Sequence, residues 1–218
     1  MIDQKRTVET VRLSLRERQR AEREGLILRE AERLLSEEGY DGLVMERLAE
    51  RVGISKGTIY QHFAKKEDLF GAIILRGLER MNEQLTIHLA DGTRPAAARL
   101  GAVMTLLIEG SSAWMSTITG PQKHELAAAL ADHPELRDAR TRFFDGLCTL
   151  IVQGQEAGEL DPAVPAPIAA RFLLSLVGSR GWSALRGEAA VSAEDFAALA
   201  VRFYVHGLSV HSLEESSR

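Results

Sequence analysis

Apolar residues recur at steps of three and four along almost the whole chain, which is the spacing of amphipathic α-helices. A first run extends from Ile27 to Leu35, after which Gly39 offers a left-handed helix cap. A second run follows Asp68 and ends before the turn-forming residues 91–95. Further helices are expected over residues 94–117, 121–132, 134–157, 165–186 and 193–213, bounded by Gly, Pro or capping residues. Because turn-bounded alternation of apolar and polar residues is absent, the sequence predicts an all-α protein.

The composition is that of a globular protein, with 45% hydrophobic and 27% charged residues among 218. A net charge of -4 is too close to neutral for binding to nucleic acid or membrane through bulk charge, so any such contact must be local. The single cysteine, Cys148, cannot form an internal disulfide. We find no signal-peptide pattern and no apolar run near the ~18 residues that span a bilayer. We therefore expect a cytoplasmic protein with no membrane partner.

Residues 1–29 carry a local excess of positive charge, because eight basic side chains stand against five acidic ones, a difference of +3. The basic residues are Lys5, Arg6, Arg12, Arg16, Arg18, Arg20, Arg23 and Arg29. We expect residues 1–23 to form a basic N-terminal arm. This arm either reaches into a DNA minor groove or is a solvated arm or an extension of the first helix.

Two short helices separated by a glycine are predicted in residues 45–63. Ala49 is small enough for the second helix to approach closely, and Gly53 can take the positive φ of a sharp turn. Ser55 is a good N-cap for the second helix, and Ile59, ten residues after Ala49, fills the corner between the two. This is the spacing of a helix-turn-helix. A helical hairpin in an adaptor that mediates protein contacts is the alternative.

The chain resembles the TetR/AcrR family of transcriptional regulators over about residues 24–70. The residues that match the family signature are Ile27, Leu28, Ala31, Gly39, Tyr40, Leu48, Ala49, residues 52–60, His62, Phe63 and residues 66–69. The resemblance implies a three-helix helix-turn-helix DNA-binding domain over residues 24–70 and a helical-bundle ligand-binding and dimerisation domain over residues 71–218. It also implies that the DNA contacts come from Ser55, Lys56, Gly57, Thr58, Tyr60, Gln61, His62 and Lys66.

The side chains of the second short helix support this interpretation, because hydroxyl, amide, cationic and aromatic groups suit phosphates and base edges. One departure from the family concerns Leu43 and Val44, which stand where the family usually has threonines that cap the first helix of the motif and touch phosphate. Asp41 is the residue available to cap that helix instead. Its negative charge would lie near DNA.

Enzymatic patterns are absent from the sequence. His124 and Glu125 begin like a zinc-binding helix, but Ala128 stands where the second metal ligand is required. His206 and His211 are five residues apart, which places them off one helical face. There is no phosphate-binding loop and no nucleophile elbow. We therefore expect no enzymatic activity, no cofactor and no metal.

The resemblance further implies a homodimer that binds a pseudo-palindromic operator, acts as a repressor and is released by a small-molecule effector. Apolar faces in the last two helices are expected to form the dimer contact, with Phe203 within it. Some residues are candidates for lining an effector cavity: Met104, Glu109, Trp114, Met115, Phe143, Phe144 and Leu147. Each also fits ordinary core packing except Glu109, whose carboxylate within an apolar helix needs a partner such as a cationic ligand, an arginine or surface water. Gly71 and Gly77, inside the long helix, are either packing necessities or points where the helix bends.

Overall fold

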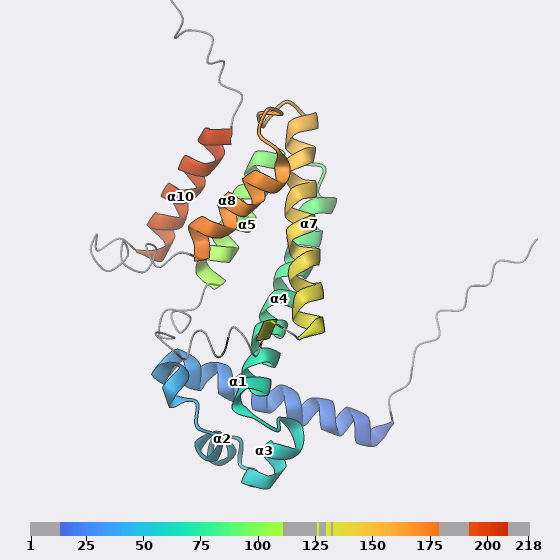
Figure 1. Cartoon of the computed structure of the whole chain (residues 1–218), viewed down its shortest axis with the longest axis vertical. Coiled ribbons are helices and arrows are strands. Elements are labelled where there is room, and N and C mark those ends of the chain that lie inside the picture. The colour runs from blue at the N-terminus through green and yellow to red at the C-terminus, as the bar shows by residue number, and fades with distance from the viewer. Residues whose placement is uncertain (1–13, 111–125, 127–129, 132, 179–191, 209–218) are drawn as a thin grey trace, which may run out of the picture.

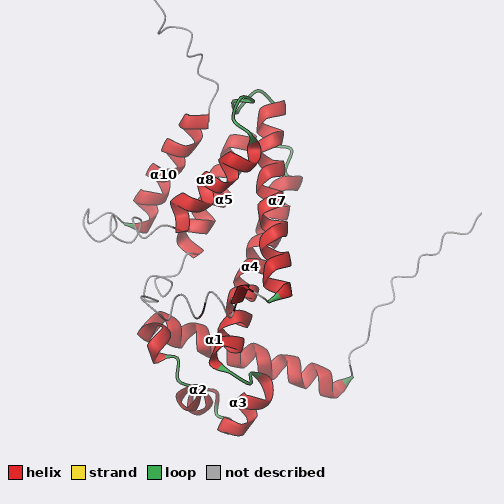
Figure 2. Cartoon of the chain, in the orientation of Figure 1, coloured by secondary structure: helices red, strands yellow, loops and turns green. Residues whose placement is uncertain are grey.

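The computed structural model describes residues 14–110, 126, 130–131, 133–178 and 192–208. These residues form helices and connecting loops, with no strand among them (Figure 2), so the all-α prediction is confirmed. The helices are α1 (Leu15–Gly42), α2 (Met45–Val52), α3 (Lys56–His62), α4 (Lys66–Ala90), α5 (Ala96–Gly110), α7 (Pro134–Glu156), α8 (Ala166–Gly178) and α10 (Ala193–Leu208). Figure 1 shows α1, α2 and α3 at one end of the molecule, with α4 leading from them to the other helices.

The first hydrophobic core lies between α1, α2, α3 and the start of α4. Ile27 and Leu34 of α1, Leu48 of α2 and Ile59 of α3 are fully buried in it. Phe70 of α4 completes this core at 1% exposure. Each helix therefore contributes the apolar stripe that its sequence period predicts, and α1, α2 and α3 share one small core with the start of α4.

The second core lies between α4, α5, α7, α8 and α10. α4 packs along α7, and α10 packs against α5. Met104, Leu147 and Leu173 are fully buried there, and Leu85 brings the distal end of α4 into the same core. α4 is thus shared between the two cores, which fixes how the helix-turn-helix unit is attached to the bundle.

A tight corner after α7 holds three helices together. Gly158 adopts a positive φ of 71°, which allows the chain to reverse direction. The carboxylate of Glu159 then accepts a hydrogen bond from the backbone N–H of Ala97, at the start of α5, at 2.8 Å. The backbone N–H of Asp161 donates to the carbonyl of Leu208, at the end of α10, at 2.7 Å. This corner therefore fixes the distal ends of the bundle helices.

The start of α1 differs from the expected domain boundary. The helix begins at Leu15, so residues 15–23 are a helical extension, and residues 1–13 lie outside the described part. Ser14 and Glu17 form a reciprocal capping box at this start. The expected boundary at residue 23 therefore falls inside a helix, and the boundary at residue 70 falls inside α4.

One local expectation around the end of α1 is wrong, and a second stays untested. Gly39 has a positive φ of 71° but an extended ψ of -170°, so it kinks the helix instead of capping it, and α1 continues to Gly42. The N-cap of α2 is Val44, whose side chain makes no cap hydrogen bond, and the capping role expected of Asp41 stays a prediction. The expected ends of the later helices at residues 117, 186 and 213, and most of the expected helix over 121–132, lie outside the described residues.

The two glycines inside α4 lie in different environments, which gives a first prediction. An added Cβ at Gly71 would lie 3.0 Å from Cδ2 of Leu130, whereas one at Gly77 would have nothing within 4 Å. Gly77→Ala should therefore raise the free energy of unfolding by about 1 kcal/mol through helix propensity alone. Gly71→Ala should gain less, because Leu130 must move. Denaturant titration of both variants measures this order, and an equal or larger gain for Gly71→Ala would contradict it.

Candidate nucleic-acid interface

The turn between α2 and α3 has the geometry that the sequence predicts. Gly53 adopts the left-handed conformation, with φ 75° and ψ 32°, and its N–H donates to the carbonyl of Ala49 at 3.0 Å. The N–H of Ile54 also donates to Ala49 at 3.0 Å, which closes the end of α2. Ile59 is fully buried in the first core. The expected helix-turn-helix is therefore formed.

Ser55 begins α3 through a cap formed by its own side chain, as predicted. Its hydroxyl oxygen accepts a hydrogen bond from the backbone N–H of Thr58 at 3.1 Å. The Thr58 hydroxyl lies 2.8 Å from the same oxygen and is half-buried. The structure thus places the Thr58 side chain in the cap of the helix.

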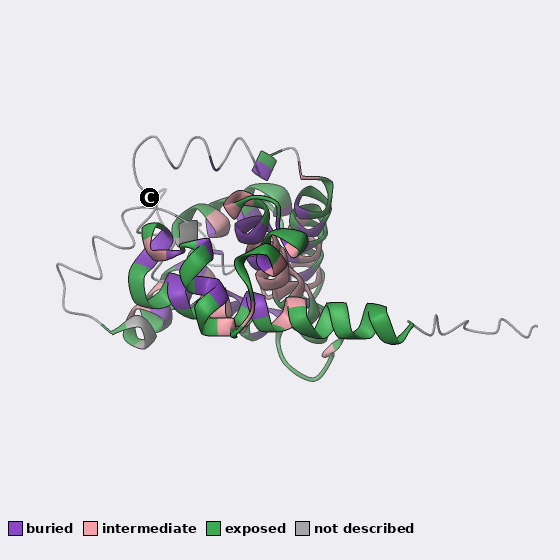
Figure 3. Ribbon diagram, turned by 90° about the horizontal axis from the view of Figure 1, so that it is seen from below, coloured by how far each residue is buried: buried purple, intermediate pink, exposed green. Residues whose placement is uncertain are grey.

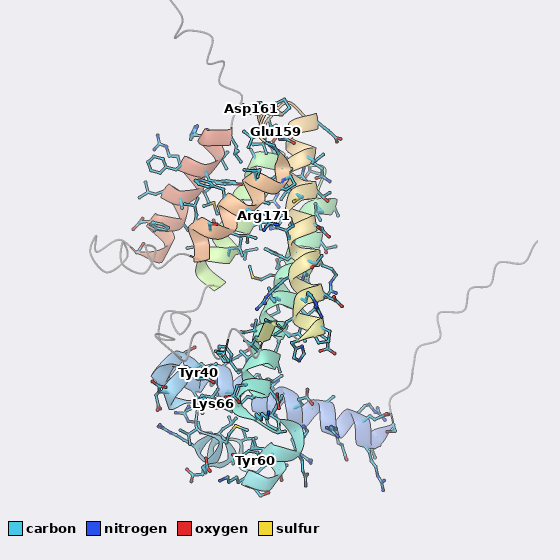
Figure 4. All side chains as sticks on the ribbon, viewed as in Figure 1. Tyr40, Tyr60, Lys66, Glu159, Asp161 and Arg171 are labelled. Carbon is cyan, nitrogen blue, oxygen red and sulfur yellow. The ribbon has the colours of Figure 1, made fainter. Side chains whose placement is uncertain are left out.

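One face of α3 is open to solvent. Lys56, Gly57, Tyr60 and Gln61 are exposed, and their spacing of one and four residues places them on the same side of the helix. Figure 4 shows Tyr60 at the end of the molecule farthest from the corner that contains Glu159 and Asp161. The structure therefore brings four of the eight predicted contact residues together on one accessible surface.

Lys56 is paired with an acidic side chain from the neighbouring helix. Its ammonium forms an ion pair with Glu46 of α2 and lies 5.7 Å from the centroid of the Tyr60 ring. The hydrogen bond between Lys56 and Glu46 raises the pKa of the lysine and lowers that of the carboxyl. Both groups are therefore charged near neutral pH, and Glu46 offsets the lysine charge on this surface.

His62 lies at the end of α3 but faces inward. Its side chain is only 5% exposed, and Nδ1 lies 3.5 Å from a carboxylate oxygen of Glu24 on α1. This buried Nδ1 makes no hydrogen bond. The structure therefore places His62 between α3 and α1, away from the open face of α3.

Lys66 joins the start of α4 to the end of α1. Its ammonium donates a hydrogen bond to the carbonyl of Tyr40 at 2.7 Å and lies 3.9 Å from the centroid of the same ring. Burial lowers the pKa of Lys66, and the carboxylates of Asp41 and Glu67 oppose that shift. The Tyr40 ring in turn packs edge-on against Phe70 at 5.1 Å between centroids. Figure 4 shows Tyr40 and Lys66 close together near the junction of α1 and α4.

Ion pairs between α1 and α2 are a feature that sequence reasoning missed. Arg47 pairs with Glu38, and Arg51 pairs with Glu37 at 2.6 Å. These pairs depend on how α2 folds back after the kink at Gly39, and no local pattern in the sequence marks them. They hold α2 against α1 through exposed contacts, each of which contributes little by itself.

The candidate effector residues are partly outside the described chain. Trp114 and Met115 lie outside it, and Glu109 is in α5 but its side chain is not described. The others pack in or against the second core: Met104, Phe143, Phe144 and Leu147. A hollow of about 400 Å³ lies between α5 and α10, next to Ala97 and Val201, and none of these candidates lines it. Their role in effector binding stays a prediction.

The described residues add two observations about chemistry. No helix among them is long and apolar enough to cross a membrane. No three potential metal-ligating side chains converge in the same described part of the chain.

The fold and the exposed face of α3 define the class of protein, which is a helix-turn-helix DNA-binding protein.

Comparison with known proteins identifies the family. The family model of bacterial regulatory proteins of the tetR family matches residues 27–73, so this part of the chain has the DNA-binding domain of the TetR/AcrR family of transcriptional regulators. It is 46% identical over 57 residues to the transcriptional repressor AcnR of Corynebacterium diphtheriae, covering 26% of this chain and only 30% of AcnR. It is 28% identical over 163 residues to the transcriptional regulator UidR of Escherichia coli, covering 69% of this chain and 75% of UidR.

The whole fold is also similar to that of a solved regulator. The structure of FadR from Bacillus subtilis, determined in complex with stearoyl-CoA, matches with a TM-score of 0.65 at 16% identity, covering 84% of this chain and 98% of FadR. At this identity the likeness concerns the fold. The family consists of regulatory transcription factors, in agreement with the absence of enzymatic motifs from the sequence.

The contact between Lys66 and Tyr40 gives a prediction about stability. Lys66→Ala should lower the free energy of unfolding by about 1–2 kcal/mol, because it leaves the Tyr40 carbonyl without its charged donor. Lys56→Ala removes an exposed ion pair and an exposed contact with the Tyr60 ring and should change stability little. Urea unfolding of both variants provides the measurement. If both variants unfolded at the same urea concentration as the parent, Lys66 would not hold α4 to α1.

Proposed function

We propose that this chain is a homodimeric transcriptional repressor that binds a pseudo-palindromic operator and releases it when a small molecule binds. The observation that carries the proposal is the open face of α3 in a correctly formed helix-turn-helix. Lys56, Tyr60 and Gln61 project from this face, and Gly57 leaves the backbone accessible between them. Such a face can enter the major groove and combine phosphate contacts with base contacts.

The eight predicted contact residues divide into two groups under this proposal. Lys56, Gly57, Tyr60 and Gln61 meet the operator directly from the open face of α3. The other four hold α3 in position or lie at its margin: Ser55, Thr58, His62 and Lys66. Lys66 reaches a phosphate only if its ammonium leaves the Tyr40 carbonyl or bridges both groups.

The proposed dimer contact lies on α8 and α10. Phe203 of α10 is 79% exposed and Phe172 of α8 is 61% exposed, values unusual for phenylalanine in a monomer surface. Ile168 and Leu199 are also exposed on these helices. Figure 1 shows α8 and α10 side by side at the end of the molecule away from α3. A two-fold axis at this contact would place one α3 of each protomer on the same side of the dimer. A pseudo-palindromic operator requires the two α3 helices to lie about 34 Å apart.

The proposed effector acts through α4. This helix begins next to α3 and ends in the bundle, where it packs along α7. The complex of FadR with stearoyl-CoA supports an organic effector, which we place among the bundle helices, although its identity for this chain stays open. An effector releases DNA only if it binds the DNA-incompetent arrangement of the helices more tightly than the DNA-competent one, because only then does it shift the equilibrium between the two.

A mobility-shift assay tests the function directly. The probe is the DNA that flanks the protein's own gene, with a scrambled duplex of equal length as competitor. Retention of the flanking DNA in preference to the scrambled duplex is the expected result. A protein that retained neither duplex would favour the adaptor alternative and overturn the proposal.

Base reading by Gln61 predicts a sequence-specific loss of affinity. Gln61→Ala should weaken operator binding by ~1–3 kcal/mol, because the side-chain amide no longer pairs with a base edge, and should leave the scrambled duplex almost unaffected. Gln84→Ala provides a matched control, because Gln84 is an exposed glutamine on α4. Fluorescence anisotropy with both duplexes measures the difference. Equal losses on the two duplexes would show that Gln61 does not read a base.

The proposed dimer contact predicts a change of assembly. Phe203→Glu should give monomers with a folded helix-turn-helix and little operator affinity, because a dimer would have to bury an unpaired carboxylate. Ile87→Glu is the control, since Ile87 is 57% exposed on α4 and lies outside α8 and α10. Sedimentation velocity gives the molecular mass in solution. A Phe203→Glu protein that remained dimeric would place the contact elsewhere.

A further inference from the structure

The first three turns of α1 extend beyond the core of the helix-turn-helix. The helix begins after Ser14, whose capping box with Glu17 satisfies the first backbone N–H groups. The first fully buried residue of α1 is Ile27, twelve residues after Leu15, which corresponds to about 18 Å of helix. Figure 3 shows this exposed stretch projecting from the packed helices. The extension therefore gains no stability from the core and must be explained in another way.

Three arginines form a stripe along this extension. Arg16, Arg20 and Arg23 are separated by four and three residues, so their side chains leave the helix on one face. The next step of four reaches Ile27, which is buried against the rest of the helix-turn-helix. The stripe therefore continues the packed face of α1 toward its N-terminus. Glu24, one residue after the stripe, contacts His62 at the end of α3. The stripe therefore lies on the side of α1 that faces α3, and it extends beyond the end of α3.

The charges of this arginine stripe have no partner in the described part of the chain. All three side chains are exposed, and none forms an ion pair or hydrogen bond there. Arg16 and Arg20 are four residues apart, an arrangement of like charges that weakens an isolated helix. Glu17 is already engaged in the capping box, which lowers the pKa of its carboxyl. A row of guanidinium groups without an ion pair or hydrogen bond, at the spacing of a helix face, fits an external polyanion.

We infer that the arginine stripe of Arg16, Arg20 and Arg23 binds the phosphate backbone of DNA beside the bases that α3 contacts. This inference rests on the proposed function and extends the DNA footprint of each protomer. Arg16 and Arg23 are about 10 Å apart along the helix, and a DNA strand offers a phosphate every ~3.4 Å of helix axis. The stripe can therefore meet successive phosphates without reading sequence, while α3 supplies the base contacts.

Two double variants with the same change of charge test the inference. Arg20→Ala with Arg23→Ala removes two members of the stripe. Arg18→Ala with Arg29→Ala removes two exposed arginines from the opposite face of α1. Alanine preserves helix propensity, which circular dichroism will check. Binding to the operator and to a scrambled 40-base-pair duplex is measured between ~0.05 and ~0.3 M salt.

The stripe variant should weaken binding to both duplexes alike, by roughly tenfold or more at ~0.1 M salt. It should also reduce the slope of log affinity against log salt by ~0.9 for each phosphate that the protein no longer neutralises. The opposite-face variant should change neither quantity by a comparable amount. Equal effects of the two variants, or no effect of either, would overturn the inference while leaving the proposed function in place. A parent protein that bound neither duplex would overturn both.

Shortening the DNA provides an independent test of where the stripe binds. Removing ~5 base pairs from each end of the operator duplex should weaken binding of the parent protein, because the outer phosphates that the stripe contacts are removed. The same shortening should hardly affect the stripe variant, which lacks the arginines that would bind these phosphates. If shortening weakened both proteins by the same factor, the stripe would not lie on the flanking phosphates.

Discussion

The burial of α4 in two hydrophobic cores constrains the rest of this molecule. Phe70 and Ile73, near its start, are buried with α1, α2 and α3, and Leu85, near its end, is buried with the bundle helices. A helix of 25 residues spans about 37 Å, so one rigid element connects the two cores. Because close-packed cores resist gradual deformation, a displacement of α4 at one end requires repacking at the other.

The orientation of α3 follows from this constraint. Phe63, directly after α3, is buried in the first core, and α4 begins three residues later. Lys66, at the start of α4, donates a hydrogen bond to the carbonyl of Tyr40 on α1, while His62 packs between α3 and α1. The helix that presents Tyr60 and Gln61 is thus held by both of its long neighbours. A change in the angle between α1 and α4 would therefore reorient the open face of α3 without unfolding it.

The sequence predicted the parts of the site that depend on local chemistry. Gly53 takes the left-handed turn, Ser55 caps α3 and Ile59 is buried, because each role follows from neighbours within a few residues. The orientations of His62 and Lys66 could not be predicted in this way, since they depend on how α1 crosses α3 and α4. The start of α1 had a visible signal, namely the capping box formed by a serine and a glutamate three positions later, and that signal extends the helix into the supposed arm.

The distribution of charge explains how a chain with a net charge of -4 can bind a polyanion under the proposed function. α3 contains one lysine, Lys56, and Glu46 already offsets its charge, so α3 alone exerts little attraction on phosphate. Neutral side chains on α3, such as Gln61, then contribute mainly to the difference between one base sequence and another. If general attraction came instead from the exposed arginines of α1, affinity and sequence preference would reside on separate helices. Salt would then weaken binding to every sequence while leaving the preference among sequences largely intact.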